Sequence, residues 1–214
     1  MTSVRVASRL RHAAVVLAAV ALVACKQQPP RVAGALHGPT LSQPIAKPNF
    51  TLTATDGKPF NFRERTSGQL ALLFFGYTNC PDVCPVHAAN IAAVLRTLSW
   101  EDRRRVTFVF VTTDPARDTL AALRKWLDHF DSTFVGLRGP IDTVNAIQQR
   151  LGLPAAFAEP KDSTGGYGVG HAAVVLAFEP DDSARVLYPF GVRQEDWAAD
   201  IPKLLARAKP SAKR

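Results

Sequence analysis

Two cysteines near the middle of the chain, Cys80 and Cys84, are the residues best suited to do chemistry. They lie in the segment 74–85, which joins an apolar run to a sequence with helical periodicity. In the first turn of a helix, side chains four residues apart share one face, so both sulfurs can point to one spot. Unpaired N–H groups and the positive end of the helix dipole favour thiolate there. The pattern predicts a disulfide-exchange pair, a structural disulfide or a soft-metal site.

A metal site would need a further ligand. Structural zinc usually takes four protein ligands, and the only other cysteine, Cys25, is assigned below to a lipid. Two thiolates and an imidazole suit copper, because Cu(I) prefers sulfur and Cu(II) accepts nitrogen. His171 ends a glycine-rich loop and begins an apolar strand, and a lone histidine in such a place is first interpreted as structural. The cysteine pair instead favours His171 as a metal ligand. His87 and His129 are predicted to be solvated surface residues.

The surrounding sequence predicts the elements that must position these side chains. Residues 50–62 indicate a hairpin around Asp56-Gly57. Apolar runs predict buried strands, and 3.6-residue periodicity predicts helices. The strands are expected at 69–75, 106–111, 133–137, 172–178 and 186–190, and the helices at 86–98, 118–130, 142–151 and 194–208. Residues 152–170 form a long glycine-rich loop. This alternation predicts an α/β domain with a mixed sheet and helices on both faces.

The N-terminal stretch predicts an export signal. Three arginines precede an apolar run over 13–24, which is too short to cross a bilayer, and Cys25 follows at once. We predict that residues 1–24 are a lipoprotein signal peptide and that Cys25 carries the lipid. An uncleaved anchor, or ordinary cleavage that leaves a free thiol, are the alternatives. No apolar run is long enough for a polytopic membrane protein.

The rest of the chain divides by composition. We predict a flexible tether over 25–46, which is rich in proline, a folded domain over 47–209 and a basic tail over 210–214. The formal net charge of +8 falls to +5 without the three arginines of the leader. No basic stripe with interleaved aromatic residues is present, so nucleic acid is not an expected partner.

Three motifs occur in an order that resembles the Sco/SenC family, and the similarity covers roughly residues 45–205. They are Gly-Tyr-Thr-x-Cys-Pro-Asp-Val-Cys-Pro at 76–85, Thr-Thr-Asp-Pro-x-Arg-Asp-Thr at 112–119 and Tyr-Gly-Val-Gly-His at 167–171. The resemblance implies a thioredoxin-like fold, with a central mixed sheet flanked by helices and an N-terminal hairpin extension. It also implies copper bound by Cys80, Cys84 and His171.

Two further residues bear on that resemblance. Family members usually carry Asp-His-Ser where this chain has Gly170-His171-Ala172, so a carboxylate or hydroxyl beside the imidazole is missing. Such partners typically change metal affinity about 10–100-fold. Asp114 resembles the family's aspartate after the central strand, for which we weigh helix capping or turn formation against a role near the metal or a partner.

The resemblance implies a metallochaperone rather than an enzyme. It would receive copper and pass it to the apo copper-centre subunit of cytochrome c oxidase, with another copper chaperone or a thioredoxin-like reductant as a further partner. The rival is a thiol–disulfide reductase that keeps the copper-ligand cysteines of that subunit reduced. Nothing marks the pocket of a peroxidase. The expected location is the bacterial cell envelope, lipid-anchored to the membrane and facing the periplasm.

Overall fold

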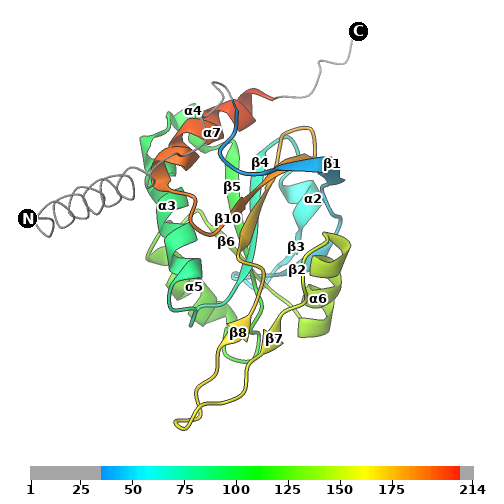
Figure 1. The fold of residues 1–214 in the computed structure, drawn as a ribbon, viewed down its shortest axis with the longest axis vertical. Coiled ribbons are helices and arrows are strands. Elements are labelled where there is room, and N and C mark those ends of the chain that lie inside the picture. The colour runs from blue at the N-terminus through cyan, green and yellow to red at the C-terminus, as the bar shows by residue number, and fades with distance from the viewer. Residues whose placement is uncertain (1–34, 208–214) are drawn as a thin grey trace, which may run out of the picture. The chain divides into compact units, whose positions relative to one another are not determined.

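The computed structural model describes residues 35–207, and Figure 1 shows the order of their elements. The strands are β1 (Thr40–Ala46), β2 (Thr51–Ala54), β3 (Pro59–Asn61), β4 (Leu70–Gly76), β5 (Val106–Thr112), β6 (Val135–Arg138), β7 (Phe157–Ala158), β8 (Val169–Gly170), β9 (Val174–Phe178) and β10 (Ser183–Pro189). The helices are α2 (Phe62–Arg65), α3 (Val83–Thr97), α4 (Trp100–Arg103), α5 (Leu120–Asp128), α6 (Ile141–Arg150) and α7 (Gln194–Ala206).

Eight strands form one mixed sheet in the order β1-β10-β9-β4-β5-β6-β2-β3. β4, β5 and β6 are parallel, and the other neighbours are antiparallel. Every residue of β4 is buried, as the continuous apolar run predicts for a strand covered on both faces. β7 and β8 pair separately as a small hairpin inside the segment that was expected to be a loop. The thioredoxin-like arrangement and the β2–β3 hairpin extension are both confirmed.

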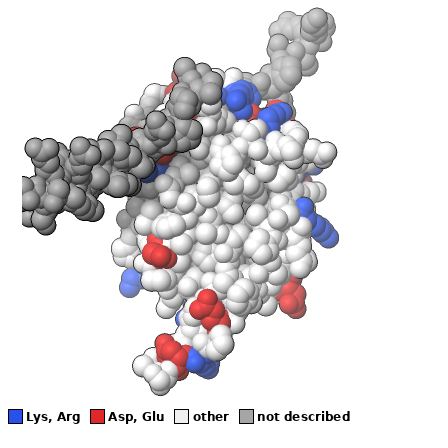
Figure 2. Space-filling model, viewed as in Figure 1, with Lys and Arg blue, Asp and Glu red and all other residues white. Residues whose placement is uncertain are grey.

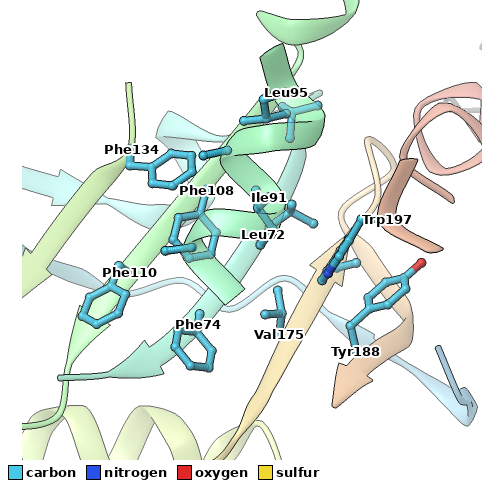
Figure 3. Packing of buried hydrophobic residues seen from close by; sticks show 14 of the residues in the cluster. Leu72, Phe74, Ile91, Leu95, Phe108, Phe110, Phe134, Val175, Tyr188 and Trp197 are labelled. Atoms are coloured by element: carbon cyan, nitrogen blue, oxygen red, sulfur yellow. The ribbon is translucent and has the colours of Figure 1, made fainter. Parts of the chain in front are cut away.

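The alternating side chains of β4 build a core on each face of the sheet. Leu70, Leu72 and Phe74 join one hydrophobic cluster with residues of α3, α5 and α7. Figure 3 shows part of this cluster, with Phe74, Phe108 and Phe110 to one side of Ile91 and Leu95, and Trp197 against Tyr188. The other set, Ala71, Leu73 and Phe75, packs with residues from α2 and α6. Helices on both faces, as predicted, therefore enclose the central strands.

The structure corrects the predicted tether. Residues 40–46 are not a free linker but form β1, which pairs antiparallel with β10 at the edge of the sheet. Pro44 is tolerated because an edge strand leaves one side without ladder bonds. The backbone N–H and the ring Nδ1 of His37 also lie 2.6 and 2.9 Å from the two carboxylate oxygens of Asp200. The folded domain therefore begins about ten residues earlier than predicted.

Several predicted features lie outside the described residues: the signal peptide over 1–24, Cys25 and the basic tail over 210–214. No helix within residues 35–207 is long and apolar enough to cross a membrane. Both hydrophobic clusters draw all their members from residues 36–205. Because the whole core lies within that range, we expect this part of the chain to fold without the preceding segment.

Candidate metal centre

The end of β4 and the start of α3 position the two cysteines. After Gly76 the chain turns, and the Cys80 N–H donates to the Tyr77 carbonyl over 3.2 Å. Asp82 then caps α3, its carboxylate accepting from the Val83 N–H at 2.6 Å. Cys84 is the second residue of the helix and Pro85 the third, so α3 begins three residues before the predicted start at residue 86. Proline is tolerated there because N–H groups of the first turn have no partner within the helix.

Gly76 leaves the space that the Cys84 sulfur occupies. A Cβ atom at Gly76 would lie 2.6 Å from Cys84 Sγ and 2.9 Å from the Phe74 ring. The Cys84 side chain is fully buried, whereas Cys80 retains 8% of its surface exposed. One sulfur of the pair is thus part of the core, and the other lies at its edge. Both cysteines are free thiols in this structure.

The sheet pairing brings His171 to the cysteines. β9 runs antiparallel to β4, with Val175 opposite Phe74, so the chain that enters β9 lies beside the end of β4. His171 falls between β8 and β9, and its Nε2 atom is 3.9 Å from Cys80 Sγ and 3.7 Å from Cys84 Sγ. The three ligand atoms all lie within 4.8 Å of one another. An imidazole 87 residues beyond Cys84 therefore shares one site with both sulfurs.

These separations fit a metal ion. Metal–sulfur and metal–nitrogen bonds of about 2.3 and 2.0 Å, spread by about 120° around one ion, place their ligand atoms roughly 3.7–4.0 Å apart. The two measured sulfur–nitrogen distances, 3.9 and 3.7 Å, are close to that separation. Two soft sulfurs and one imidazole nitrogen form a donor set suited to copper. Cys80, Cys84 and His171 are therefore a candidate three-ligand metal site.

The two thiols differ in their proton affinity. The hydrogen bond from the Cys84 thiol, with further ones from His171 and the N–H groups of Cys84 and Asp82, holds the pKa of Cys80 far below the ordinary thiol value; burial opposes this shift. Burial, followed by the neighbouring Cys80 sulfur, raises the pKa of Cys84. At neutral pH the pair is therefore one thiolate, Cys80, that accepts a hydrogen bond from one thiol, Cys84.

Backbone and aromatic groups hold the His171 ring. Nδ1 lies 3.2 Å from the Ala172 carbonyl oxygen. In the tautomer with its N–H at Nδ1, the Nε2 lone pair faces the sulfurs and can bind a metal, whereas in the other tautomer Nε2–H donates to the Cys80 sulfur. The rings of Phe74 and Tyr77 meet the imidazole edge-on, at centroid distances of 5.9 and 5.6 Å. The carbonyl takes the position of the outer partner that a carboxylate or hydroxyl commonly supplies. The absence of such side chains at 170 and 172 therefore does not leave the ring unsupported.

Gly170 has its own structural reason. A Cβ atom there would lie 2.5 Å from carbon atoms of the Phe157 ring. Phe157 pairs with Gly170 across the β7–β8 hairpin, and its side chain is 64% exposed. The Phe157 ring thus occupies the space that any side chain at position 170 would need, which explains why this chain has glycine there.

Asp114 lies away from the three ligand atoms and supports the loop that leads to His171. Its carboxylate accepts from the Tyr167 hydroxyl at 3.0 Å and forms an ion pair with Arg117 Nε. Arg117 also donates to the Tyr167 carbonyl at 2.9 Å. The Arg117 guanidinium lies 3.6 Å from the centroid of the Tyr167 ring and 5.8 Å from that of Tyr77, which touches His171. Within the described residues, no metal-ligand group includes Asp114.

Sequence reasoning missed the role of Asp118. The sequence allows either Asp118 or Thr119 to cap the helix that follows, and Thr119 is the cap of α5, accepting from the Ala122 N–H. Asp118 is fully buried and accepts hydrogen bonds from Thr78 N–H at 3.1 Å and from the hydroxyls of Thr78 and Thr112, both at 2.5 Å. It therefore ties the cysteine loop to the end of β5. The repeated Thr and Asp residues of the 112–119 motif were the available signal.

The prediction of a solvated His87 is wrong. Its side chain is 1% exposed, and its ring packs against Phe74 and Phe190 at centroid distances of 5.0 and 6.1 Å. Neither ring nitrogen makes a hydrogen bond of ordinary geometry, although the Ala173 backbone interacts with the ring. Burial lowers the pKa of His87 to about 4, so the ring is neutral. The prediction failed because His87 follows Cys84 by three residues and so shares its inward face of α3. His129 is exposed, as predicted.

Comparison with known proteins agrees with the geometry. The family model described as SCO1/SenC matches residues 39–206. A protein of Stutzerimonas stutzeri named for copper binding is 34% identical over 140 residues, which span 65% of this chain and 67% of that protein. The mitochondrial protein SCO2 of Saccharomyces cerevisiae is 31% identical over 134 residues, 62% of this chain and 44% of its own length. The chain thus matches less than half of the yeast protein.

A solved structure gives the same result. The copper-bound ScoI of Bradyrhizobium japonicum superposes with a TM-score of 0.66 and 30% identity, covering 75% of this chain and all of that one. The family match covers more than three quarters of the sequence, from before β1 to the last residue of α7, and includes both cysteines and the histidine. The chain belongs to the SCO1/SenC family.

Proposed function

We propose that this protein binds copper through Cys80 Sγ, Cys84 Sγ and His171 Nε2. The observation that carries the proposal is the convergence of these three atoms, with sulfur–nitrogen distances of 3.9 and 3.7 Å. Two sulfurs satisfy Cu(I), and the imidazole lets the same site accept Cu(II). Cys80 already carries the charge that ligation requires. Cys84 releases its proton when the metal binds, so copper affinity rises with pH.

The cargo role follows from family membership. Sco proteins are a family of cytochrome c oxidase assembly proteins. We propose that this chain delivers copper to the dinuclear copper centre of the oxidase, with the apo subunit as acceptor and a second copper chaperone or a thioredoxin-like reductant as further partners. Oxidation of Cys80 and Cys84 to a disulfide would remove both sulfur ligands, so the redox state of the pair would control loading.

A thiol–disulfide reductase is the second candidate, and the unequal cysteine pair favours it. The Cys80 thiolate would attack a substrate disulfide, breaking its S–S bond, releasing one thiolate and forming a mixed disulfide. Cys84, once deprotonated, would attack the Cys80 sulfur, release the second thiol and leave a Cys80–Cys84 disulfide. A dithiol reductant must then restore the pair. The buried Cys84 suits the resolving position and the more exposed Cys80 the attacking one.

Replacing His171 separates the two functions, because disulfide exchange does not need an imidazole. In an anaerobic titration of reduced residues 26–214, we expect His171→Ala to lose tight copper binding and its thiolate-to-copper absorption. The same variant should still cycle between dithiol and disulfide. His129→Ala changes an exposed histidine and serves as the matched control. Wild-type copper affinity in His171→Ala would refute the ligand assignment.

We propose that the domain is held at the envelope membrane by a lipid on Cys25, facing the periplasm. The support is the sequence pattern, a basic and apolar leader directly followed by cysteine. Cys25→Ser should leave the protein unprocessed or soluble after cell fractionation. Incorporation of labelled palmitate should stop in this variant, and continued labelling would contradict the proposal.

A further inference from the structure

A hollow lies at the end of the domain away from the metal centre. It has a volume of about 440 Å³ and is lined by Trp100, Arg103, Arg104, Val106, Thr107 and Thr133. Trp100 is 75% exposed, the largest value among the exposed large hydrophobic side chains of the described residues. The guanidinium of Arg104 lies over its ring, 4.7 Å from the centroid. This concave surface, with an exposed indole beside arginines, has no role in binding copper at Cys80, Cys84 and His171.

The hollow and the metal centre lie at opposite ends of α3. Cys84 is in the first turn of that helix, and Trp100 follows its last residue, Thr97, by three positions. Fifteen helical residues at about 1.5 Å each separate the two ends by roughly 22 Å. The direction of the parallel strands β4 and β5 also places the two sites at opposite ends. The cysteines follow the last residue of β4, whereas the hollow is lined by Val106 and Thr107, the first residues of β5. In Figure 1, α4 accordingly lies at the end opposite the β7–β8 hairpin.

The charges at this end favour an anionic ligand. Arg103 is paired with Asp131 at 2.8 Å and Arg105 with Asp102 at 3.3 Å. Within the described residues, the structure shows no ion pair for the exposed Arg104 guanidinium, whose recorded contact is the Trp100 ring. Arg105 also donates to the Leu205 carbonyl at 2.9 Å, which joins this end of the domain to α7. Figure 2 shows Lys and Arg side chains, with Asp or Glu among them, where α7 ends.

We propose that the Trp100–Arg104 hollow binds the phosphate headgroup of an anionic phospholipid and so docks this end of the domain on the bilayer. Tryptophan suits this position because its ring is apolar while its N–H reaches polar headgroups. Arginine suits phosphate because its guanidinium offers several donors in one plane. The site takes one phosphate and its glycerol, with Trp100 in the headgroup layer.

The length of chain before the domain favours a bilayer as the occupant, and this step rests on the proposed lipid at Cys25. Nine residues lie between Cys25 and Ala35, and this stretch spans at most about 35 Å in any conformation. Leu36, next in the chain, packs against the cluster that contains residues of α7. The domain must therefore stay close to the membrane that holds the lipid. Docking through the hollow would direct the copper centre away from the bilayer, toward partners in the aqueous phase.

The test uses residues 26–214, which lack the lipid but contain the whole folded core. Binding to phosphatidylglycerol–phosphatidylcholine vesicles is measured by co-sedimentation, with pure phosphatidylcholine vesicles as the neutral comparison. We expect binding to the anionic vesicles alone, weakened by salt. We also expect a blue shift of tryptophan emission, because Trp126 is half-buried and Trp197 fully buried, which leaves Trp100 as the responsive indole.

Two variants address the hollow and two control for the class of substitution. Arg104→Gln should weaken vesicle binding roughly fivefold, and Trp100→Ala by at least as much. Lys125→Gln removes another exposed cation, and Phe157→Ala another exposed ring at the opposite end; both should bind as the wild type does. Urea unfolding of each variant checks the fold and is independent of the lipid result.

Three results would overturn the inference. The first is equal sedimentation with neutral and anionic vesicles. The second is wild-type binding by both Trp100→Ala and Arg104→Gln. The third is full displacement from the vesicles by millimolar inorganic phosphate at constant ionic strength, which would assign the hollow to a free phosphate. None of these results bears on whether Cys80, Cys84 and His171 hold copper, so the two proposals fail separately.

Discussion

Replacing Gly76 with alanine tests whether the metal centre depends on the packing beneath it. The new Cβ would lie 2.6 Å from Cys84 Sγ, whereas ordinary contact begins at 3.4 Å, so the sulfur must move by about 0.8 Å. Metal–ligand distances tolerate only about 0.2 Å. No ligand is removed, but the site is distorted. We expect copper affinity to fall roughly 10–100-fold, as when outer partners of a metal ligand are lost.

The same substitution overpacks the core, and a control separates the two effects. Overpacking costs about 1–3 kcal/mol of unfolding free energy. Gly136→Ala, on β6, would place its Cβ 2.7 Å from Leu127 and 2.8 Å from Thr55, with no residue of the metal centre in contact. Both variants should unfold at lower denaturant concentration, but only Gly76→Ala should lose copper affinity in a competition titration with a chelator. Equal affinities in the two variants would refute the reasoning.

Two further predictions concern titrating groups near the centre. Iodoacetamide should alkylate Cys80 before Cys84, even at pH values well below the ordinary thiol pKa. The reason is that Cys80 is held as a thiolate, while burial keeps Cys84 protonated. Equal labelling of the two cysteines in peptide mapping would contradict this prediction. His87 has a pKa of about 4 in the folded protein against an ordinary 6.5. The folded state therefore binds fewer protons than the unfolded state between these values, and stability falls as the pH drops from about 6.5 to about 4, by roughly 3 kcal/mol. His87→Leu should remove this acid sensitivity in urea unfolding at pH 7.5 and 4.5, whereas His129→Leu should keep it. An unchanged pH dependence in His87→Leu would show that other groups cause the acid sensitivity.

The sequence supports accurate prediction where local pattern and burial coincide. The run that became β4 is apolar at every position, and β4 is the strand buried on both faces. The cysteine spacing predicted both sulfurs in the first turn of a helix. Cys84 lies in the first turn of α3, whereas Cys80 lies in the loop before it, three residues ahead of Val83. The motif order then suggested His171, whose approach to the cysteines depends on the antiparallel pairing of β9 with β4. No local pattern contains that strand pairing. The cysteine pair favoured His171 as a ligand, and the family resemblance supported the same choice.

The errors come from residues whose environment is set by distant parts of the chain. β1 has one half-buried face, carried by Leu41 and Ile45, and its proline and polar residues are typical of a linker as much as of an edge strand. His87 is polar, yet it lies on the inward face of α3 between Phe74 and Phe190. Phe190 lies about a hundred residues later in the chain, so the helical periodicity around His87 could not predict this contact.

The unequal burial of the three candidate ligands gives the site a direction. Cys84 lies in the interior under Gly76, whereas Cys80 keeps part of its surface exposed and His171 is partly exposed. An acceptor can therefore approach an ion held there only from the side of Cys80 and His171. Ligand exchange would begin at these two outer donors and end at the interior sulfur. The bond to Cys84 Sγ, which solvent cannot reach, would then be the last to break when the ion leaves. It would also be the first to be shielded from solvent when the ion arrives.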